Sequence, residues 1–465
     1  MIQFGTGGFR AIIGENFTKE NVQLIGEAIY RIMLEDQYQM DQPVVIGYDR
    51  RFLSKESAQW LAEILVHHGV RIKFIGYSCP TPLVMFVVKE CNLAYGFMIT
   101  ASHNPAIYNG VKVFSEGGRD ADQAFTRRIE ETCNKVHLPA GIKPYHALDC
   151  IDVIDPLNEY IDLILSFLDV RKIRDAHLKI AFDPMYGVST TALQTILMTT
   201  RCYVDVINQR HDTLFGGKLP SPNAETIQQL QVMVQEKDYD LGIATDGDAD
   251  RLGVVDSDGT FVDPNKILSL IYYYFLNYKG LKGDVVRNLS TTMLVDRIAE
   301  DYGFASHEVP VGFKHITHAM KEHDAIIGGE SSGGLTVKGY LNGKDSVFAA
   351  SLLVEIVATT QKTIAQLTQE IEEKYGKLYT REEAIDIRHI ELQTLLERMS
   401  KVTSEAVPAA LQVSHMDGLK VWFAAGWVLV RPSGTEPLLR ISCEGSIQAD
   451  LPQYIELMKE CLEIT

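Results

Sequence analysis

The sequence lacks any run that approaches the roughly 18 uninterrupted apolar residues of a membrane span. Its densest candidates, Leu268–Leu276 and Val347–Ala358, are short or carry Glu355. The start of the chain has neither a basic nor an apolar signal region, so we expect no secretory signal. The seven cysteines are scattered without a Cys-x-x-Cys pair, which argues against a disulfide framework. These absences predict a reduced, cytoplasmic protein.

Basic residues are fewer than acidic residues. Lys and Arg number 44 against 61 Asp and Glu, a formal net charge of −17, which argues against nucleic acid or anionic membranes as partners. Hydrophobic residues make up 46% and charged residues 23%, values typical of soluble globular proteins, so collagen-like and disordered classes are excluded. At about 150 residues per domain, the 465 residues predict three or four domains.

Short β-rich apolar runs alternate with stretches of helical period, a pattern typical of parallel sheets covered by helices. The final ninety or so residues differ, and we expect a helix at 390–402, a strand pair around 421–430 and 438–443, and a closing helix there. Turn clusters place the domain boundaries near residues 155, 256 and 373. The predicted strands elsewhere are 43–48, 70–75, 93–100, 178–182, 203–207 and 241–245, and the predicted helices are 18–36, 54–68, 189–199 and 225–236.

The first loop that could carry chemistry follows the apolar run Tyr95–Ile99 and reads Thr-Ala-Ser-His-Asn-Pro. Such a segment lies beyond the carboxyl end of a strand, where ligands bind in open α/β sheets. Ser102 stands beside His103 and within reach of Lys112, and a serine oxygen becomes reactive when a base, a metal or a positive field activates it. An ordinary Ser/Asn/Pro turn is the alternative.

The second loop carries carboxylates at alternate positions, Asp246, Asp248 and Asp250. In a nearly extended backbone we expect them to converge on one point, where carboxylate oxygens favour Mg²⁺ or Ca²⁺. An EF-hand is excluded, because Arg251 and Ser257 stand where that loop needs Gly and Glu. An acidic, solvated turn remains the alternative.

The third loop, Gly328–Gly334, contains a formal Gly-x-Ser-x-Gly match centred on Ser331. A hydrolase nucleophile elbow needs a helix directly after that serine, and the following Gly-Gly-Leu-Thr-Val is poor helix material. We therefore interpret the segment as a polar loop in which Glu330 and Ser332 contact ligand hydroxyls. A plain glycine-rich turn is the alternative.

The fourth loop, Arg431–Arg440, concentrates two guanidiniums, two hydroxyls and a glycine between two apolar runs. These groups favour an anion-binding cradle. A Walker loop is excluded, because its Gly-x₄-Gly-Lys-Ser/Thr pattern occurs nowhere in the chain. A hairpin turn with solvated arginines is the alternative.

Taken together and in this order, the four loops resemble the active-site loops of the α-D-phosphohexomutase family, the phosphoglucomutases and phosphomannomutases. The opening Phe-Gly-Thr-Gly-Gly-Phe-Arg of Phe4–Arg10 also resembles that family. The resemblance covers essentially the whole chain. It implies an α/β fold of four domains around a central cleft: three related mixed α/β sandwich domains, 1–155, 156–256 and 257–373, and a smaller C-terminal α+β domain, 374–465.

The resemblance also implies a role for each loop residue. Ser102 is expected to be phosphorylated and, with its phosphate, to hold Mg²⁺ together with Asp246, Asp248 and Asp250. The reacting phosphoryl group is expected to be lined by Arg10, His103, Lys112 and Arg251, with Lys112 the best candidate for proton transfer. Sugar hydroxyls are expected to contact Lys314, Glu330 and Ser332. The non-reacting phosphate is expected to be gripped by Arg431, Ser433, Gly434, Thr435 and Arg440.

The implied reaction interconverts hexose 1-phosphate and hexose 6-phosphate, with glucose favoured, through a phosphoserine enzyme and a hexose 1,6-bisphosphate intermediate that also activates the enzyme. Phosphomannomutase or phosphoglucosamine mutase activity is the alternative, followed by a metal-dependent sugar phosphatase or a silent sugar-phosphate-binding protein. The expected partners are small sugar phosphates, and the expected state is a monomer or homodimer. Some relatives carry a histidine where this chain has Gly334, so we expect no proton transfer from that position.

Overall fold

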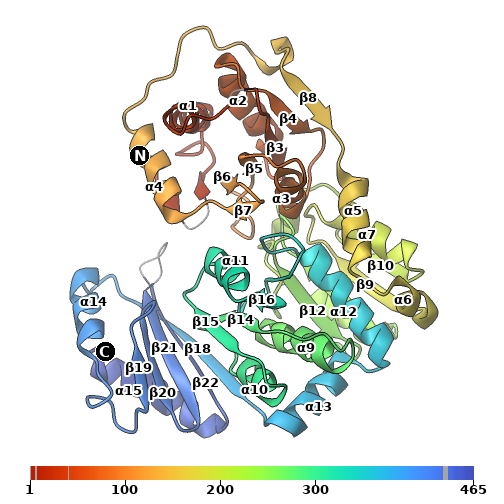
Figure 1. Cartoon of the computed structure of the whole chain (residues 1–465), viewed down its shortest axis with the longest axis vertical. Coiled ribbons are helices and arrows are strands. Elements are labelled where there is room, and N and C mark those ends of the chain that lie inside the picture. The colour runs from red at the N-terminus through yellow and green to blue at the C-terminus, as the bar shows by residue number, and fades with distance from the viewer. Residues whose placement is uncertain (1, 6–7, 40, 433–437, 465) are drawn as a thin grey trace. The chain divides into compact units, whose positions relative to one another are not determined.

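The computed structural model describes residues 2–5, 8–39, 41–432 and 438–464 (Figure 1). The chain divides into two compact units. The first contains Met1–Ile267 with Ser332–Ala365, and the second contains Leu268–Ser331 with Gln366–Thr465. The limits of the four predicted domains stay predictions.

The N-terminal sheet of the first unit is mixed. Its strand order is β1-β2-β6-β5-β3-β4-β8, with β7 paired to β6. β5, β3, β4 and β8 run parallel, whereas β6 is antiparallel to both β5 and β2. The predicted serine loop therefore leaves the sheet at the carboxyl end of β5. The strands are β1 Phe4–Gly5, β2 Gly8–Ile12, β3 Val44–Tyr48, β4 Ile72–Ile75, β5 Tyr95–Ile99, β6 Tyr108–Ser115, β7 Arg119–Asp120 and β8 Ile151–Ile154.

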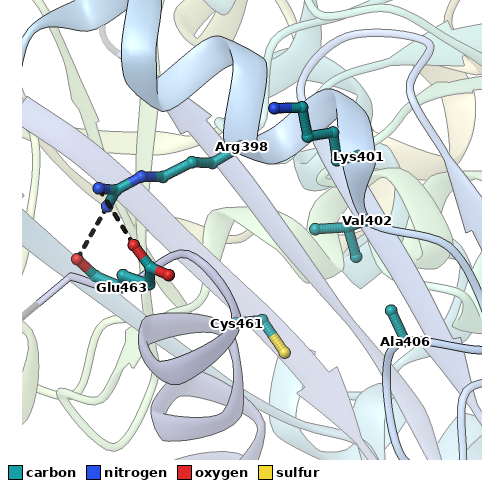
Figure 2. Close-up of a pocket in the computed structure, with 6 residues that line it drawn as sticks. All are labelled: Arg398, Lys401, Val402, Ala406, Cys461 and Glu463. Atoms are coloured by element: carbon teal, nitrogen blue, oxygen red, sulfur yellow. Dashed lines mark hydrogen bonds and ion pairs between the residues drawn. The ribbon is translucent and has the colours of Figure 1, made fainter.

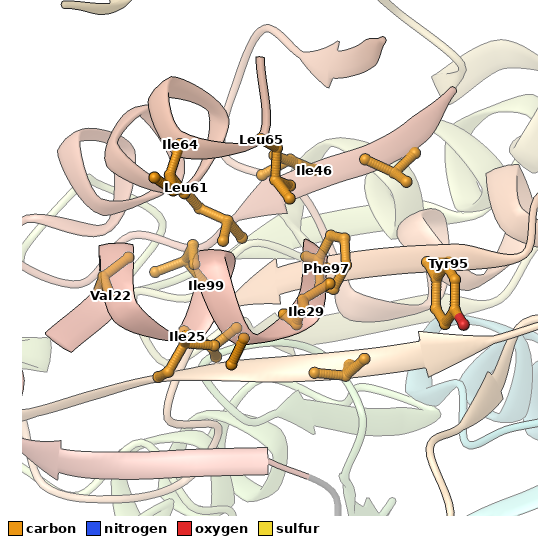
Figure 3. Close-up of a cluster of buried hydrophobic side chains, with 14 of the residues drawn as sticks. Val22, Ile25, Ile29, Ile46, Leu61, Ile64, Leu65, Tyr95, Phe97 and Ile99 are labelled. Carbon is orange, nitrogen blue, oxygen red and sulfur yellow. The ribbon is translucent and has the colours of Figure 1, made fainter. Parts of the chain in front are cut away.

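Helices cover both faces of this sheet. Figure 3 shows apolar side chains of α1 (Lys19–Glu35) and α2 (Ser54–His67), such as Ile25 and Leu61, packed on Phe97 of β5. α4 (Gln123–Cys133) also packs against α1. Gly96, the neighbour of Phe97 in β5, faces the opposite side, where an added Cβ would meet Val88 of α3 (Thr81–Glu90) at 2.4 Å. The close packing of α3 thus depends on a residue without a side chain.

The second sheet of the first unit has the order β10-β9-β11-β12-β13. β10, β9 and β11 are parallel, while β12 and β13 are antiparallel to their neighbours. Both sheets are therefore mixed, with antiparallel strands added to the parallel strands that the alternating pattern predicted. The elements are η1 Tyr145–Ala147, α5 Leu157–Ser166, α6 Val170–Ala176, β9 Lys179–Asp183, α7 Thr190–Thr199, β10 Tyr203–Val206, η2 Phe215–Gly217, α8 Gln228–Glu236, β11 Leu241–Thr245, β12 Leu252–Asp256 and β13 Phe261–Val262.

The second unit begins with a parallel arrangement in which β14 lies between β15 and β16. Val286 of β14 packs with Phe313 and Ile316 of α11 (Phe313–Glu322) in a small buried core. The elements from this part of the sequence are α9 Pro264–Asn277, β14 Val285–Asn288, α10 Leu294–Asp301, β15 Ser306–Val309, α11 Phe313–Glu322, β16 Ile327–Gly329, β17 Leu335–Val337, α12 Ser346–Thr360 and α13 Ile364–Tyr375.

The C-terminal sheet is antiparallel, with the order β18-β22-β21-β20-β19. The prediction of one strand over 421–430 was wrong, because β20 and β21 form a hairpin that turns between Phe423 and Gly426. The predicted helix at 390–402 is confirmed as α14. The elements are β18 Tyr379–Asp386, α14 Leu392–Lys401, β19 Gln412–Ser414, β20 Leu419–Phe423, β21 Gly426–Pro432, β22 Leu438–Gly445, η3 Gln448–Asp450 and α15 Leu451–Cys461.

Among the described residues, no single helix has both the length and the apolar character needed to cross a membrane. Only α12 and α13 taken together reach that length and composition, and they are bent by 77° at their junction.

Candidate active site

Ser102 lies on the tight connection that leaves the carboxyl end of β5. Its backbone has a φ of 51°, the left-handed region that residues with side chains rarely adopt, and its side chain is buried. The backbone N–H of Ser102 donates to Thr100 Oγ1 at 2.9 Å. Strain of this kind persists only where neighbouring groups hold it, and it is concentrated at functional sites.

The three aspartates lie on the turn that joins the antiparallel strands β11 and β12. The expectation of a nearly extended backbone was wrong, because Ala249 takes a φ of 64° and the segment forms a tight turn. The carboxylates nevertheless converge. One oxygen from each of Asp246, Asp248 and Asp250 lies within 4.8 Å of the others, and all three side chains are buried. Ser102 Oγ donates to Asp246 Oδ2 at 2.9 Å, so the serine and acidic loops share one site.

The donor set of this cluster fits a hard divalent cation. Burial, together with the charges of Asp248 and Asp250, raises the pKa of Asp246 well above its usual value. Burial also acts to raise the pKa of Asp250, but Lys112, Lys344 and Arg251 outweigh it and hold that pKa well below normal. Asp248 Oδ1 is buried without a hydrogen-bond partner among the described residues. Carboxylate oxygens in this state suit Mg²⁺ or Ca²⁺.

The predicted cationic residues of the first unit surround this cluster. Lys112 Nζ donates to Asp248 Oδ2 at 2.6 Å and to Asp250 Oδ2 at 2.8 Å. Arg10 on β2 donates to Asn104 Oδ1 in the serine loop at 2.8 Å. The Nε of Arg251 is buried and has no hydrogen-bond partner among the residues described here.

His103 is held in its neutral form. Burial, followed by the charges of Arg251 and Arg10, lowers the pKa of His103 from 6.5 to about 3. Its Nδ1 lies 3.3 Å from Ser102 Oγ. The imidazole can therefore exchange a hydrogen bond with the serine without adding charge.

Two residues close to the aspartates were not predicted from the sequence. Thr81, at the start of α3, donates from Oγ1 to Asp248 Oδ2 at 2.7 Å. Lys344 Nζ lies 3.9 Å from Asp250 Oδ2. The segment around Lys344 is anchored on both sides, since Asn342 Nδ2 donates to Gly117 O at 2.7 Å and Ser346 Oγ to Ala249 O at 2.7 Å. Neither residue stands in a motif, so only the fold could reveal it.

The predicted sugar and phosphate residues fall into both units. Ser332 belongs to the first unit and is half-buried. In the second unit, Glu330 Oε1 accepts from the N–H of Gly312 at 3.3 Å, and Lys314 lies in the first turn of the adjoining helix α11. The structure thus brings the Glu330 loop beside the Lys314 segment.

A line of hydrogen bonds continues from this segment to the predicted phosphate loop. The N–H of Val311 donates to Asp417 Oδ2 at 2.9 Å, and the guanidinium of Arg431 lies 3.0 Å from the same oxygen. Asp417 was not predicted. Arg431 and Arg440 are cross-strand partners in β21 and β22, so both project from the same face. The predicted residues Ser433, Gly434 and Thr435 lie outside the described residues.

Two other features carry no part of this site. Ser331, the formal elbow serine, exchanges a hydrogen bond with Ser290 Oγ at 2.8 Å and precedes a turn and strand, not a helix. A separate pocket in the C-terminal domain holds none of the predicted residues, and its arginine is engaged by the backbone and side chain of Glu463 (Figure 2). Its lining consists of Arg398, Lys401, Val402, Ala406, Cys461 and Glu463.

Comparison with protein families gives four matches that together cover most of this chain. The models for phosphoglucomutase/phosphomannomutase alpha/beta/alpha domains I, II and III match residues 1–139, 158–259 and 263–375. The model for the C-terminal domain of the same family matches residues 392–459. The four-domain α/β fold implied by the resemblance is therefore confirmed.

Individual relatives agree with the family models. The phosphoglucomutase/phosphomannomutase of Thermococcus kodakarensis is 31% identical over 461 residues, 99% of this chain and 98% of that one. A probable phosphoglucosamine mutase of Methanothermobacter thermautotrophicus is 30% identical, covering 96% of this chain and 94% of that one. The crystal structure of a putative phosphomannomutase from Thermus thermophilus superposes with a TM-score of 0.84 at 29% identity, covering 99% of both chains. The chain therefore belongs to the phosphoglucomutase/phosphomannomutase family of metal-dependent phosphotransferase isomerases that act on sugar phosphates.

Proposed function

We propose that this enzyme moves a phosphoryl group between the 1- and 6-positions of a hexose through a phosphorylated Ser102. The observation that carries the proposal is the 2.9 Å hydrogen bond from Ser102 Oγ to Asp246 Oδ2, within a buried cluster of three carboxylates. A serine oxygen in that position can carry a phosphoryl group beside a divalent cation. The serine is unusually confined for a plain turn residue, which favours the catalytic interpretation over the alternative of an ordinary loop.

In the proposed reaction, the bond between phosphorus and Ser102 Oγ breaks as a bond forms to the free hydroxyl of the hexose monophosphate. The attacking hydroxyl loses its proton as the bisphosphate forms, and the released Ser102 Oγ gains one, so the step consumes no net proton. The bisphosphate then turns around and returns its other phosphoryl group to Ser102. We propose Lys112 as the residue that relays this proton, because its ammonium can give one proton to Ser102 Oγ and then take the proton of the hydroxyl, and its Nζ lies in the acidic cluster beside the serine loop.

Electrostatics explain why so many cations line the site. A phosphoserine of about −2 and three carboxylates, set against one divalent cation, leave a local charge of about −3. A second phosphate approaches such a site only if Arg10, Lys112 and Arg251 offset that charge. When bound, Mg²⁺ would draw negative charge from the transferring oxygens. We propose Asp246, Asp248, Asp250 and the serine phosphate as its ligands.

The reaction also needs a separate binding site for the phosphate that does not react. We propose that Arg431 and Arg440 form this site. Their cross-strand pairing places two like charges side by side, an arrangement that favours a bound anion. Asp417 fixes Arg431 at 3.0 Å, and we propose that Ser433, Gly434 and Thr435 complete this site. Lys314, Glu330 and Ser332 would contact the sugar hydroxyls between the two phosphates.

We propose glucose phosphate as the substrate, with mannose and glucosamine phosphates as equal rivals, since relatives of similar identity carry each of these names. The test compares turnover of glucose, mannose and glucosamine 1-phosphates with Mg²⁺ and a trace of hexose 1,6-bisphosphate. One dominant substrate would identify the hexose. Release of inorganic phosphate without isomerisation would support a sugar phosphatase and overturn the proposal.

The physiological setting is also a proposal. We propose a cytoplasmic enzyme that acts as a monomer or homodimer on free sugar phosphates, without nucleic acid or membrane partners. Fractionation of cells and light scattering of the purified protein would test the location and the oligomeric state.

A further inference from the structure

Arg51 makes an unusual set of contacts with the loop that carries Ser102. Its side chain is fully buried, and its two terminal nitrogens donate to four backbone carbonyl oxygens of that one loop. The Nη2 atom donates to Ser102 O and Asn104 O, both at 2.6 Å. The Nη1 atom donates to Pro105 O at 2.8 Å and Tyr108 O at 3.0 Å. Four carbonyl dipoles that point at one place repel one another unless a cation joins them.

The neighbouring Asp49 holds the same loop from the other side of Ser102. Asp49 Oδ2 accepts from Thr100 Oγ1 at 2.7 Å, and Thr100 Oγ1 in turn accepts from the backbone N–H of Ser102 at 2.9 Å. Asp49 Oδ1 accepts from the N–H of Arg51 at 2.9 Å and from Ser54 Oγ at 2.6 Å. The N–H and the C=O of Ser102 are thus both fixed, one through Thr100 and the other by Arg51.

This arrangement bears on the reacting oxygen because Ser102 has the left-handed backbone conformation, with φ at 51°. Rotation back to an ordinary conformation would turn Oγ away from Asp246. The ring of Phe215 also confines Arg51, since the guanidinium lies 5.0 Å from the centre of that ring. The hydrogen bonds and the ion pair of Arg51 and Asp49 are made with the serine loop, with Ser54 and with each other.

We propose that Arg51 and Asp49, acting through Thr100, are positioning residues that set the Ser102 oxygen against the acidic cluster. The inference rests on the proposed function and names which residues make the serine competent. Arginine is required at 51 because its planar fork reaches four acceptors, whereas the ammonium of lysine has three donors and no fixed plane. Displacement of a reacting group by about 1 Å can cost about 100-fold in rate.

The test measures phosphorylation of Ser102 by hexose 1,6-bisphosphate in a single turnover, over a range of bisphosphate concentrations, for four variants of the full-length enzyme. Thr100→Val keeps the shape of the side chain but removes its hydroxyl, and Thr100→Ser restores the hydroxyl. Arg51→Lys keeps the charge but not the fork. The control is Arg50→Lys, because the Arg50 guanidinium donates to Tyr186 O at 3.4 Å and to Gln209 O at 2.9 Å, away from the loop of Ser102.

We expect Thr100→Val and Arg51→Lys to slow the saturating rate by about 100-fold while the half-saturating bisphosphate concentration stays within about threefold. Thr100→Ser and Arg50→Lys should remain close to the wild type. Thermal melting of each variant identifies any that fails to fold. Thr100→Ser then still tests the inference, because it shows whether a hydroxyl at position 100 is enough to keep the labelling rate of the wild type. Labelling of Arg51→Lys and Thr100→Val at the wild-type rate would overturn this inference alone, whereas a wild-type enzyme that is never labelled would overturn the proposed function.

Discussion

Lys344 lies directly against Gly334, so that a Cβ added to Gly334 would come within 2.4 Å of Lys344 Cδ and 2.9 Å of its Cγ. The absence of a side chain at 334 therefore makes room for the stem of Lys344. With that stem in place, Lys344 Nζ lies 3.9 Å from Asp250 Oδ2. A lysine from one part of the chain thus occupies the space beside the acidic cluster that a residue at 334 would otherwise fill.

This packing predicts that the effects of substitutions at the two positions are not additive. Gly334→Ala should displace Lys344 and lower kcat/KM by about tenfold. In a Lys344→Ala background the same Gly334→Ala change should have little further effect, because nothing remains to be displaced. Steady-state kinetics of the two single variants and the double variant measure the coupling. If the loss of kcat/KM in the double variant equals the product of the losses in the two single variants, the result would contradict the close packing of Lys344 on Gly334.

Metal binding should stabilise the fold as well as support activity. The ammonium of Lys112 donates to two of the three buried carboxylates and leaves negative charge in the cluster. Mg²⁺ at 100 times its dissociation constant should therefore add about 2.7 kcal/mol to the free energy of unfolding. Thermal melting with and without a chelator measures this effect. Asp248→Asn should lose it, whereas Asp258→Asn, on the exposed turn after β12, should keep it. Equal Mg²⁺ stabilisation of Asp248→Asn and the wild type would count against the proposed ligands.

A buried lysine in the second unit predicts a specific pH dependence. Lys420 donates to Glu308 and to Leu289 O, and its Nζ lies 4.5 Å from the Trp427 ring centre. Burial, followed by the charge of Arg287, lowers the pKa of Lys420 from 10.5 to about 8 despite its contact with Glu308. The folded state therefore loses this proton near pH 8, while the unfolded state keeps it up to about pH 10.5.

Between these values the unfolded state binds more protons, so the wild type should gain stability with rising pH relative to Lys420→Met. The relative gain from pH 7 to pH 10 should be about 1–3 kcal/mol. Urea unfolding of both proteins at the two pH values gives the difference, in which the titration of tyrosines cancels. A wild type that loses stability relative to Lys420→Met over this range would show that the pKa of Lys420 is not lowered.

Asp417 should matter for substrate binding through Arg431. Asp417→Asn removes the charge that fixes the Arg431 guanidinium but keeps an oxygen for the N–H of Val311. We expect KM for the sugar phosphate to rise by about tenfold with a smaller change in kcat, since a grip on the non-reacting phosphate acts on binding. Initial-rate kinetics provide the measurement. A loss confined to kcat would place Arg431 in the chemical step instead.

Much of the first unit could be predicted from the sequence, because its helices and strands are strongly periodic and end in clear signals. The helix predicted at 18–36 is α1, with Thr18 as its N-cap, and the strand predicted at 241–245 is β11. The serine and aspartate loops were predicted from local patterns, and the structure brings them together. Neither their contact distance nor the turn at Ala249 was available from spacing alone.

The errors have physical causes. The hairpin of β20 and β21 was predicted as one strand because its turn at Ala424-Ala425 has neither a proline nor an asparagine to mark it. Thr81, Lys344 and Asp417 reach the sites from distant segments that carry no motif. Arg51 could have been suspected, since it follows a strand predicted to lie parallel to the one before Ser102, and the carboxyl ends of parallel strands meet at one edge.

The most direct test of the account is to map the phosphorylated residue after incubation of the enzyme with hexose 1,6-bisphosphate and Mg²⁺. Digestion and mass spectrometry should find one added phosphoryl group, on the peptide that contains Ser102, and none in a Ser102→Ala variant, which should also be inactive. Full turnover by Ser102→Ala, or a phosphoryl group found on a different residue of an active enzyme, would contradict it.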